Sequence, residues 1–182
     1  MKLLSIFSLL VTGFLLVGCT PSTQPTPDKP KFDMTELNYK AAEKLLINSG
    51  IPRESVVIMA TVVNIDEIEK SSTLGRLISE QISSHFILKG MNVIEMKFRE
   101  NVYMKQNEGE LMLTREIGKL ATSYRANAVI VGTYAIGNSA VYINLKIIDP
   151  KSNVALSATD YVLPMNNDID DMLGIGRKSR PF

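Results

Sequence analysis

One stretch of the chain decides the fold: Val56-Val57-Ile58-Met59-Ala60-Thr61-Val62-Val63. It has the length of a strand, it is rich in β-branched side chains, and polar residues do not alternate along it. This pattern is typical of a strand that is buried on both faces in the centre of a sheet. Residues 128–136 have the same character and predict a second central strand. Gly132 keeps room on that strand for a crossing helix.

Helical patterns surround the two central strands. Apolar residues at helical spacing predict one helix from about residue 33 to residue 48. A second helix is predicted over residues 74–89, for which Ser71-Ser72-Thr73 offers capping hydroxyls. Residues 93–96 read as a shorter strand, and residues 113–124 as a third amphipathic helix. Helices therefore alternate with strands in this part of the chain.

The apolar pattern changes to a period of two after residue 138. Apolar and polar residues alternate over 141–147, a turn is predicted at 149–153, and residues 154–163 form a last strand that ends at Pro164. Together the segments predict a single-domain α/β fold, borderline α+β. Its mixed sheet has about five strands in the order β-α-β-α-β-β-β, with helices packed on it and one helix before it.

Beyond Pro164 the sequence is polar. It contains the acidic residues Asp168, Asp170 and Asp171, followed by the basic residues Arg177, Lys178 and Arg180. We place the folded domain at residues 33–164, and we expect residues 165–182 to form a flexible tail or to become ordered on a partner.

The N-terminus is typical of a bacterial lipoprotein signal. The apolar run over residues 3–17 is too short for a membrane span, which needs about 20 residues. It ends in the lipobox Leu16-Val17-Gly18-Cys19, and Cys19 is the only cysteine of the chain. Secreted proteins tend to use cysteines in pairs, so a lone thiol here indicates one that is consumed by lipidation. We expect residues 1–18 to be removed and diacylglycerol and an N-acyl chain to be attached to Cys19.

Residues 19–32 are rich in proline and small polar residues and predict an extended tether. Thr20 follows the cysteine where enterobacterial lipoproteins of the inner membrane have Asp, so by analogy we expect the outer membrane. Loss of Lys2 with the signal leaves 19 of the 20 basic residues against 19 acidic ones. A neutral chain offers no electrostatic reason to bind nucleic acid or an anionic substrate.

Motifs for catalysis are scarce. The one histidine, His85, lies near the boundary of a helical apolar stripe, where a half-buried helix residue is favoured over a general base. The chain has no Gly-x-Ser-x-Gly elbow and no P-loop, and Gly174-Ile175-Gly176 has no strand before it. Asp66, Glu67 and Glu69 follow the first central strand, where α/β sheets bind ligands, but a solvated loop is favoured. We therefore expect no catalytic residue, no metal and no cofactor other than the lipid.

Several segments, taken in order, resemble the FlgO family of flagellar outer-membrane lipoproteins. These segments are Asn64-Ile65-Asp66, Ser71-Ser72-Thr73-Leu74-Gly75-Arg76-Leu77-Ile78-Ser79-Glu80-Gln81, Lys89-Gly90, residues 109–116, residues 128–134, Tyr142-Ile143-Asn144 and residues 156–161. The resemblance spans roughly residues 56–164. Met91 departs from it, because the family has an aromatic residue after the glycine.

The resemblance implies a non-catalytic component, lipid-anchored in the outer membrane and facing the periplasm, that supports flagellar assembly or stability and motility. It implies FlgP-like and FlgT-like partners and no small-molecule substrate. It also implies self-association, as a homo-oligomer or as a ring. Within its longest segment we single out Ser72, Thr73, Gly75, Arg76 and Glu80 as a fold or interface motif. Thr73 as a helix cap and Gly75 as a point of close helix approach are fold roles, and an interface role stays open beside them.

Two other interpretations remain. Small α/β domains of this kind also occur in TolB-like and CsgG-like envelope proteins, so the chain could be a binding module of another envelope assembly. The other alternative, a small periplasmic enzyme, would need a polar pocket around Asp66 or His85.

Overall fold

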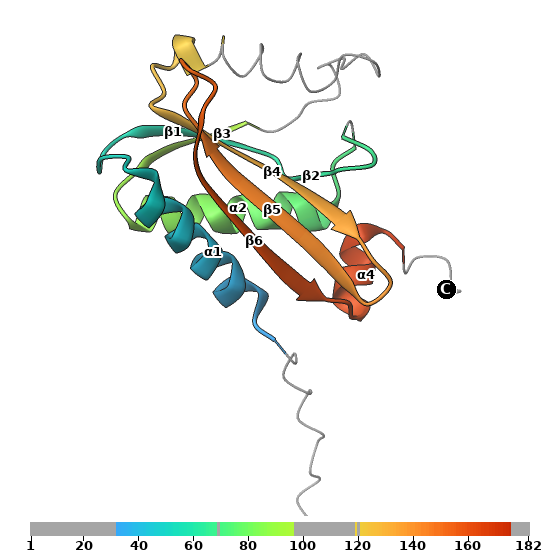
Figure 1. Ribbon diagram of the computed structural model, residues 1–182. Coiled ribbons are helices and arrows are strands. Elements are labelled where there is room, and N and C mark those ends of the chain that lie inside the picture. Colours follow the sequence, from blue (N-terminus) through green and yellow to red (C-terminus); the bar gives the residue numbers. More distant parts are fainter. Residues whose placement is uncertain (1–31, 69, 97–118, 120, 176–182) are drawn as a thin grey trace, which may run out of the picture. The chain divides into compact units, whose positions relative to one another are not determined.

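The sheet is built around β1 (Val56–Ala60), which lies between β3 (Asn92–Met96) and β4 (Ala128–Ile136) (Figure 1). Both neighbours run parallel to β1. The antiparallel strands β5 (Ala140–Ile148) and β6 (Ala155–Pro164) continue the sheet, in the order β3-β1-β4-β5-β6. The predicted mixed sheet and its two central strands are confirmed.

The computed structural model describes residues 32–68, 70–96, 119 and 121–175. Residues 1–31, which form a unit separate from Phe32–Phe182, lie outside the described residues, and with them the predicted signal, Cys19 and nearly all of the tether. Of the helix predicted over 113–124, residues 119 and 121–124 are described; residues 119 and 121–123 are helical, and residue 124 lies in a turn. No helix of the described part is long and apolar enough to cross a membrane.

Burial explains the uninterrupted apolar run of β1. Val57 and Met59 point into the main core, whereas Ile58 belongs to a smaller cluster with Ala121 and Val129 on the opposite face. Because successive side chains of a strand point to opposite faces, a strand covered on both sides is apolar at every position.

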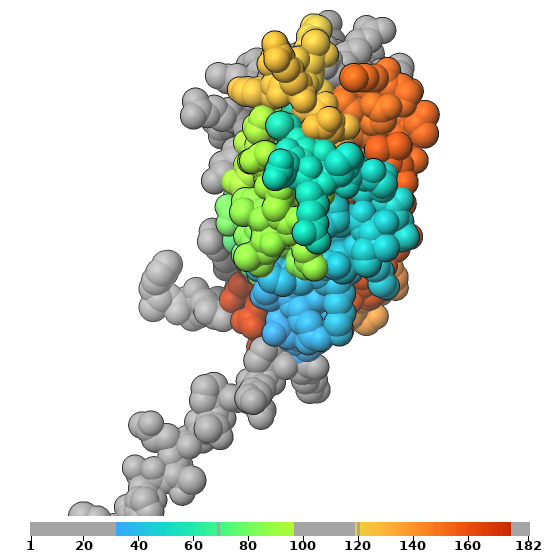
Figure 2. All heavy atoms as spheres, turned by 90° about the vertical axis from the view of Figure 1, so that its left-hand side faces the viewer, coloured from blue at the N-terminus to red at the C-terminus, as the bar shows by residue number. Residues whose placement is uncertain are grey.

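Two long helices cover the face of the sheet that carries the main core. They are α1 (Met34–Ser49) and α2 (Thr73–Leu88). Asp33 caps α1 by accepting a hydrogen bond from the Glu36 amide at 3.1 Å, and Gly50 ends it in the left-handed conformation. Figure 2 shows the segment after α1 beside the end of α2, where the Glu54 amide donates to the Gly90 carbonyl at 3.0 Å.

A chain of polar side chains joins α1 to α2 and β6. Tyr161 of β6 donates its hydroxyl to Asn38, a fully buried residue of α1. Asn38 in turn donates to Gln81 of α2 at 2.5 Å, and Gln81 donates to Thr35 at 3.0 Å. Burial raises the pKa of the Tyr161 hydroxyl, so the group stays a donor.

The first central strand is interrupted, which the apolar pattern did not predict. β1 ends at Ala60, and the chain resumes as β2 (Val63–Asn64), which pairs with β4 in register Val63 to Thr133. Between the two strands the Val62 amide donates to the Ser79 hydroxyl of α2 at 2.8 Å instead of to a strand. Within the described residues the sheet consequently has six strands instead of about five.

The expectation of a flexible tail is wrong for the residues directly after the sheet. They form α4 (Asn167–Leu173), capped by the Asn166 side chain and ended by Gly174 in the left-handed conformation. Ile169 is 1% exposed in the main core, and Met172 and Leu173 pack against that core. The three apolar residues lie on one helical face between acidic ones, so the overall polarity concealed the helix. Residues 176–182 lie outside the described residues.

Candidate functional site

The N-terminal half of α2 lies against the break between β1 and β2. The Ser79 hydroxyl accepts from the Val62 amide and donates to the Gly75 carbonyl, both at 2.8 Å. A Cβ at Gly75 would lie 2.1 Å from the Val62 carbonyl oxygen, so only glycine allows this approach. At Gly132 of β4 a Cβ would lie 2.5 Å from Leu145 and 3.0 Å from the Val62 side chain. The two glycines thus explain how α2, β4 and the strand break fit together.

Ser72, and not Thr73, caps α2. The Ser72 hydroxyl accepts from the Gly75 amide at 3.0 Å, and its backbone is extended, as is usual for a capping residue. Thr73 is the first residue of the helix, and its hydroxyl accepts from the Arg76 guanidinium at 3.2 Å. The predicted capping role of Thr73 is therefore wrong by one residue. Ser71, Ser72 and Thr73 all carry a hydroxyl that could cap the helix, so the sequence alone did not distinguish between them.

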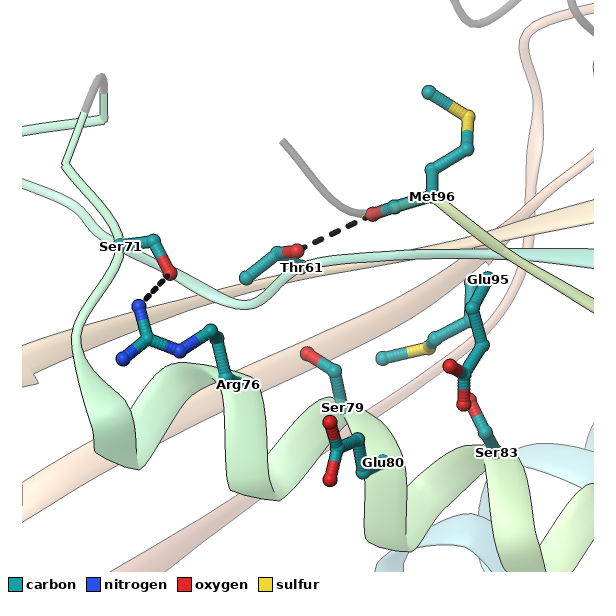
Figure 3. Close-up of a pocket in the computed structure, with 9 residues that line it drawn as sticks. Thr61, Ser71, Arg76, Ser79, Glu80, Ser83, Glu95 and Met96 are labelled. Atoms are coloured by element: carbon teal, nitrogen blue, oxygen red, sulfur yellow. Dashed lines mark hydrogen bonds between the residues drawn. The ribbon is translucent and has the colours of Figure 1, made fainter. Parts of the chain in front are cut away.

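A small cleft of about 120 Å³ opens beside this half of α2 (Figure 3). It lies where the carboxyl ends of β1 and β3 meet the helix, the place where α/β sheets commonly bind ligands. Its lining consists of Met59, Thr61, Ser71, Arg76, Ser79, Glu80, Ser83, Glu95 and Met96.

The cleft has a cationic end and an anionic end (Figure 3). Arg76 bonds the hydroxyls of Ser71 and Thr73, at 3.4 and 3.2 Å. Farther along lie Glu80, drawn beside Ser79, and Glu95, whose carboxylate is drawn beside Ser83. The buried hydroxyl of Ser83 has no hydrogen-bond partner within the described residues. The two ends can accommodate charged groups of opposite sign.

The structure brings together only part of the predicted motif. Arg76 and Glu80 line the cleft, while Ser72, Thr73 and Gly75 serve the start of α2 and its approach to the sheet. An interface role for these five residues stays a prediction.

Ser83 and Glu95 line the cleft, but the sequence did not identify either of them as a candidate site residue. Ser83 follows Ser79 by four residues, so it lies on the same helix face, and that spacing was an available signal. Glu95 could not be linked to α2 from sequence, because the contact depends on how β3 pairs with β1.

His85 takes part in a contact between helices, away from the cleft. Its Nε2 lies 2.6 Å from the Glu43 carboxylate of α1, and its ring lies 5.1 Å from that of Tyr39. Lys89 also contacts Glu43, at 2.8 Å. The hydrogen bonds from Lys89 and His85 hold the pKa of the Glu43 carboxyl below its usual value. His85 is 9% exposed, more buried than the half-buried helix residue that was favoured.

Of the acidic residues after the first central strand, Glu67 has a side-chain partner and Asp66 is held through its backbone amide. The Asp66 amide donates to the Asn64 side chain at 3.0 Å, and Glu67 pairs with Lys70 at 3.0 Å. Within the described part of the chain no group of three or more His, Cys, Asp or Glu residues could hold a metal ion. Glu69 lies outside the described residues.

Comparison with known proteins identifies the family. Residues 39–168, well over half of the chain, match the family model described as FlgO protein. No curated protein sequence matches. The fold is similar to the LpoB C-terminal domain from Salmonella enterica, with a TM-score of 0.53, 10% identity and coverage of 74% of this chain and 100% of that one. The NMR structure of E. coli LpoB gives a TM-score of 0.50, 12% identity and coverage of 81% and 78%. Such low identity shows a shared fold alone, whereas the family match shows that this chain belongs to the FlgO family.

Proposed function

We propose that this protein is a non-catalytic lipoprotein of the outer membrane that supports assembly or stability of the flagellum, and thereby motility. The observation that carries the proposal is the FlgO family match over residues 39–168. That range contains all six described strands and α2, so it covers the framework on which the cleft is built.

Lipid on Cys19 is the proposed anchor. The lipobox and the lone cysteine support it, and residues 19–32 would hold the domain away from the lipid headgroups on the periplasmic side. Two or more acyl chains hold a protein at a membrane far more firmly than one chain does.

The size of this cleft does not suit it to enclose a small-molecule substrate. At about 120 Å³ it is well below the roughly 300–1,000 Å³ of pockets that enclose small-molecule substrates. His85, the residue best suited to general acid–base work, lies against Glu43 and does not line the cleft. The proposed partners are therefore proteins: FlgP-like and FlgT-like components, and further copies of this chain in a ring.

Deletion of the gene tests the proposal. Loss of swimming, or flagella with defective outer-membrane structures, is expected, and the intact gene should restore both. The same complementation with Cys19→Ala should fail, because the unlipidated precursor would not partition into detergent with membranes, while Ser84→Ala, a surface change, should restore motility. Normal motility with intact flagella after deletion would refute the flagellar role. Normal membrane retention of the Cys19→Ala protein would refute the anchor.

A second candidate is a binding module of a different envelope assembly, as considered above for TolB-like and CsgG-like proteins. The fold shared with the LpoB C-terminal domain favours keeping it, because one fold hosts several functions. A deletion strain that swims normally but has a weakened envelope would favour this candidate over the flagellar one.

A further inference from the structure

We propose that the cleft beside α2 binds the ammonium group of a lysine side chain that a protein partner presents. The proposal goes beyond the flagellar role and does not depend on it, because it concerns only the chemistry that the cleft recognises.

The first argument is the Ser83 hydroxyl. Ser83 is 1% exposed and lines the cleft, and its hydroxyl has no hydrogen-bond partner among the described residues. A serine within a helix usually donates to the carbonyl four residues earlier, as Ser79 and Ser84 of this helix do at 2.8 Å. Leaving such a buried group unpaired is unfavourable, because it loses its hydrogen bonds to water without a replacement. The missing partner is therefore expected from outside the described residues.

The second argument is the charge around that hydroxyl. Glu95 is in register with Met59, so its side chain lies on the same face of the sheet, toward α2 (Figure 3). Within the described part of the chain Glu95 makes no ion pair and no hydrogen bond. Glu80 also lines the cleft, beside Ser79, and Arg76, the one cation of the described lining, is held at the other end by Ser71 and Thr73. Within the described residues, the Glu95 carboxylate beside Ser83 has no cation next to it, and this favours a cationic guest.

Size and donor geometry select the ammonium group. An apolar cavity of about 150 Å³ holds a molecule as small as benzene, so a cleft of about 120 Å³ accepts only the end of one side chain. An ammonium has three donors, and the Ser83 hydroxyl and the carboxylates of Glu80 and Glu95 can accept them. Carboxylates accept several bonds each, so the existing interaction of Glu80 is no obstacle. Met59 and Met96 offer an apolar wall for the aliphatic stem, and the planar guanidinium of arginine needs a wider site.

Methyl NMR of the two lining methionines provides the test. The full-length protein, labelled with ¹³C at its methionine methyl groups and purified in detergent, is titrated with Nα-acetyl-lysine amide. Nα-acetyl-norleucine amide and Nα-acetyl-arginine amide are the matched probes. Met59→Leu and Met96→Leu each remove one signal and so assign the pair. The lysine probe should shift both signals saturably in the millimolar range, the norleucine probe should shift neither, and the arginine probe should bind more weakly.

Variants of the cleft separate binding from folding. Glu95→Gln and Ser83→Ala should each weaken binding of the lysine probe about tenfold, the loss expected for one hydrogen bond to a charged group. Ser83→Ala should not lower resistance to urea, because it removes an unpaired hydroxyl, and Ser84→Ala on the neighbouring position should leave binding unchanged. The proposal is overturned if the norleucine or arginine probe binds as well as lysine, if Ser83→Ala binds like the wild type, or if no saturable shift occurs.

Discussion

The two halves of the sheet differ in how many faces are covered. In the parallel half, β1 places Val57 in the main core and Ile58 in the cluster on the opposite face. In the antiparallel half, β5 and β6 bury one face, whereas Tyr142 and Val162 on the other face are 56% and 46% exposed. The parallel half therefore holds the domain together from both sides, and the hairpin contributes one buried face and one face turned away from the described core.

This difference teaches where substitutions should matter. A residue covered from both sides has no room to relax, so a change there affects stability directly. A substitution on the outer face of the hairpin changes a side chain that is exposed to solvent, so it should affect stability little. The chain has no tryptophan, so circular dichroism in urea is the suitable measurement of unfolding in the predictions below.

The largest effect is expected at the centre of the parallel half. Ile58→Ala should lower the free energy of unfolding by about 2–5 kcal/mol, because a fully buried side chain is replaced by a cavity. For comparison, Val162→Thr on the exposed face of the hairpin should change the free energy of unfolding by no more than about 0.5 kcal/mol. Equal losses for the two variants would show that the halves do not differ in the way described.

The contact of α2 with the parallel half of the sheet, at Gly75, should not tolerate a larger side chain. Gly75→Ala places a Cβ 2.1 Å from the Val62 carbonyl oxygen, and overpacking against backbone should destabilise the fold by about 3 kcal/mol. Gly50→Ala serves as the control, since its Cβ meets open space and only the left-handed backbone penalises it, by about 1–2 kcal/mol. The urea midpoints of the two proteins compare the cost of the steric clash at Gly75 with the cost of the left-handed backbone at Gly50. A smaller loss at Gly75 than at Gly50 would contradict the tight contact.

The hairpin should matter mainly where its buried face meets α1. Tyr161→Phe removes the donor to the buried Asn38 and should cost about 1–2 kcal/mol, because an acceptor of Asn38 is left unpaired. Tyr142→Phe changes an exposed tyrosine of the same hairpin and should be neutral within about 0.5 kcal/mol. Indistinguishable urea curves for wild type and Tyr161→Phe would contradict a stabilising role of the Tyr161–Asn38 hydrogen bond.

The smallest effect is a dependence on pH at the contact between α1 and α2. The folded-state pKa of Glu43 lies below its ordinary value of 4.5. Its contribution to stability is therefore present above pH 4.5 and is lost as the pH falls through the folded-state value. Because the side chain is 36% exposed, the contribution should stay below about 1 kcal/mol after screening.

Unfolding of the wild type and of Glu43→Gln, measured between about pH 3 and pH 6, checks the sign of that effect. The two proteins should differ at the upper end of this range and converge at the lower end. A difference that grows on acidification would contradict the lowered pKa.

Much of the fold was predictable because its signals are local. The uninterrupted run of β1 and β4 and the alternation of β5 indicated the two kinds of strand. The break at Thr61-Val62 was hidden because the partner of the Val62 amide is a serine seventeen residues away. Helix α4 was missed because its acidic residues outweighed Ile169 in the overall composition.

The candidate site was predictable only in part. Arg76 and Glu80 belong to a motif that stands out in the sequence, but their position beside Glu95 depends on the pairing of β3 with β1. Likewise, the spacing of Ser83 from Ser79 indicates a shared helix face but carries no sign that the Ser83 hydroxyl will be buried without a partner. Such facts arise when elements distant in the chain meet.

The sequence by itself determined the class of the fold, the family and the expected lipid anchor at Cys19, since hydrophobic period, motif order and the lipobox are all read along the chain. Only the tertiary structure decided that α2 approaches the sheet at Gly75, that the first strand breaks to meet it, and that Ser83 and Glu95 share a cleft. The physical reason is that packing and hydrogen-bond satisfaction are properties of neighbours in space, and a single sequence does not state which residues become neighbours.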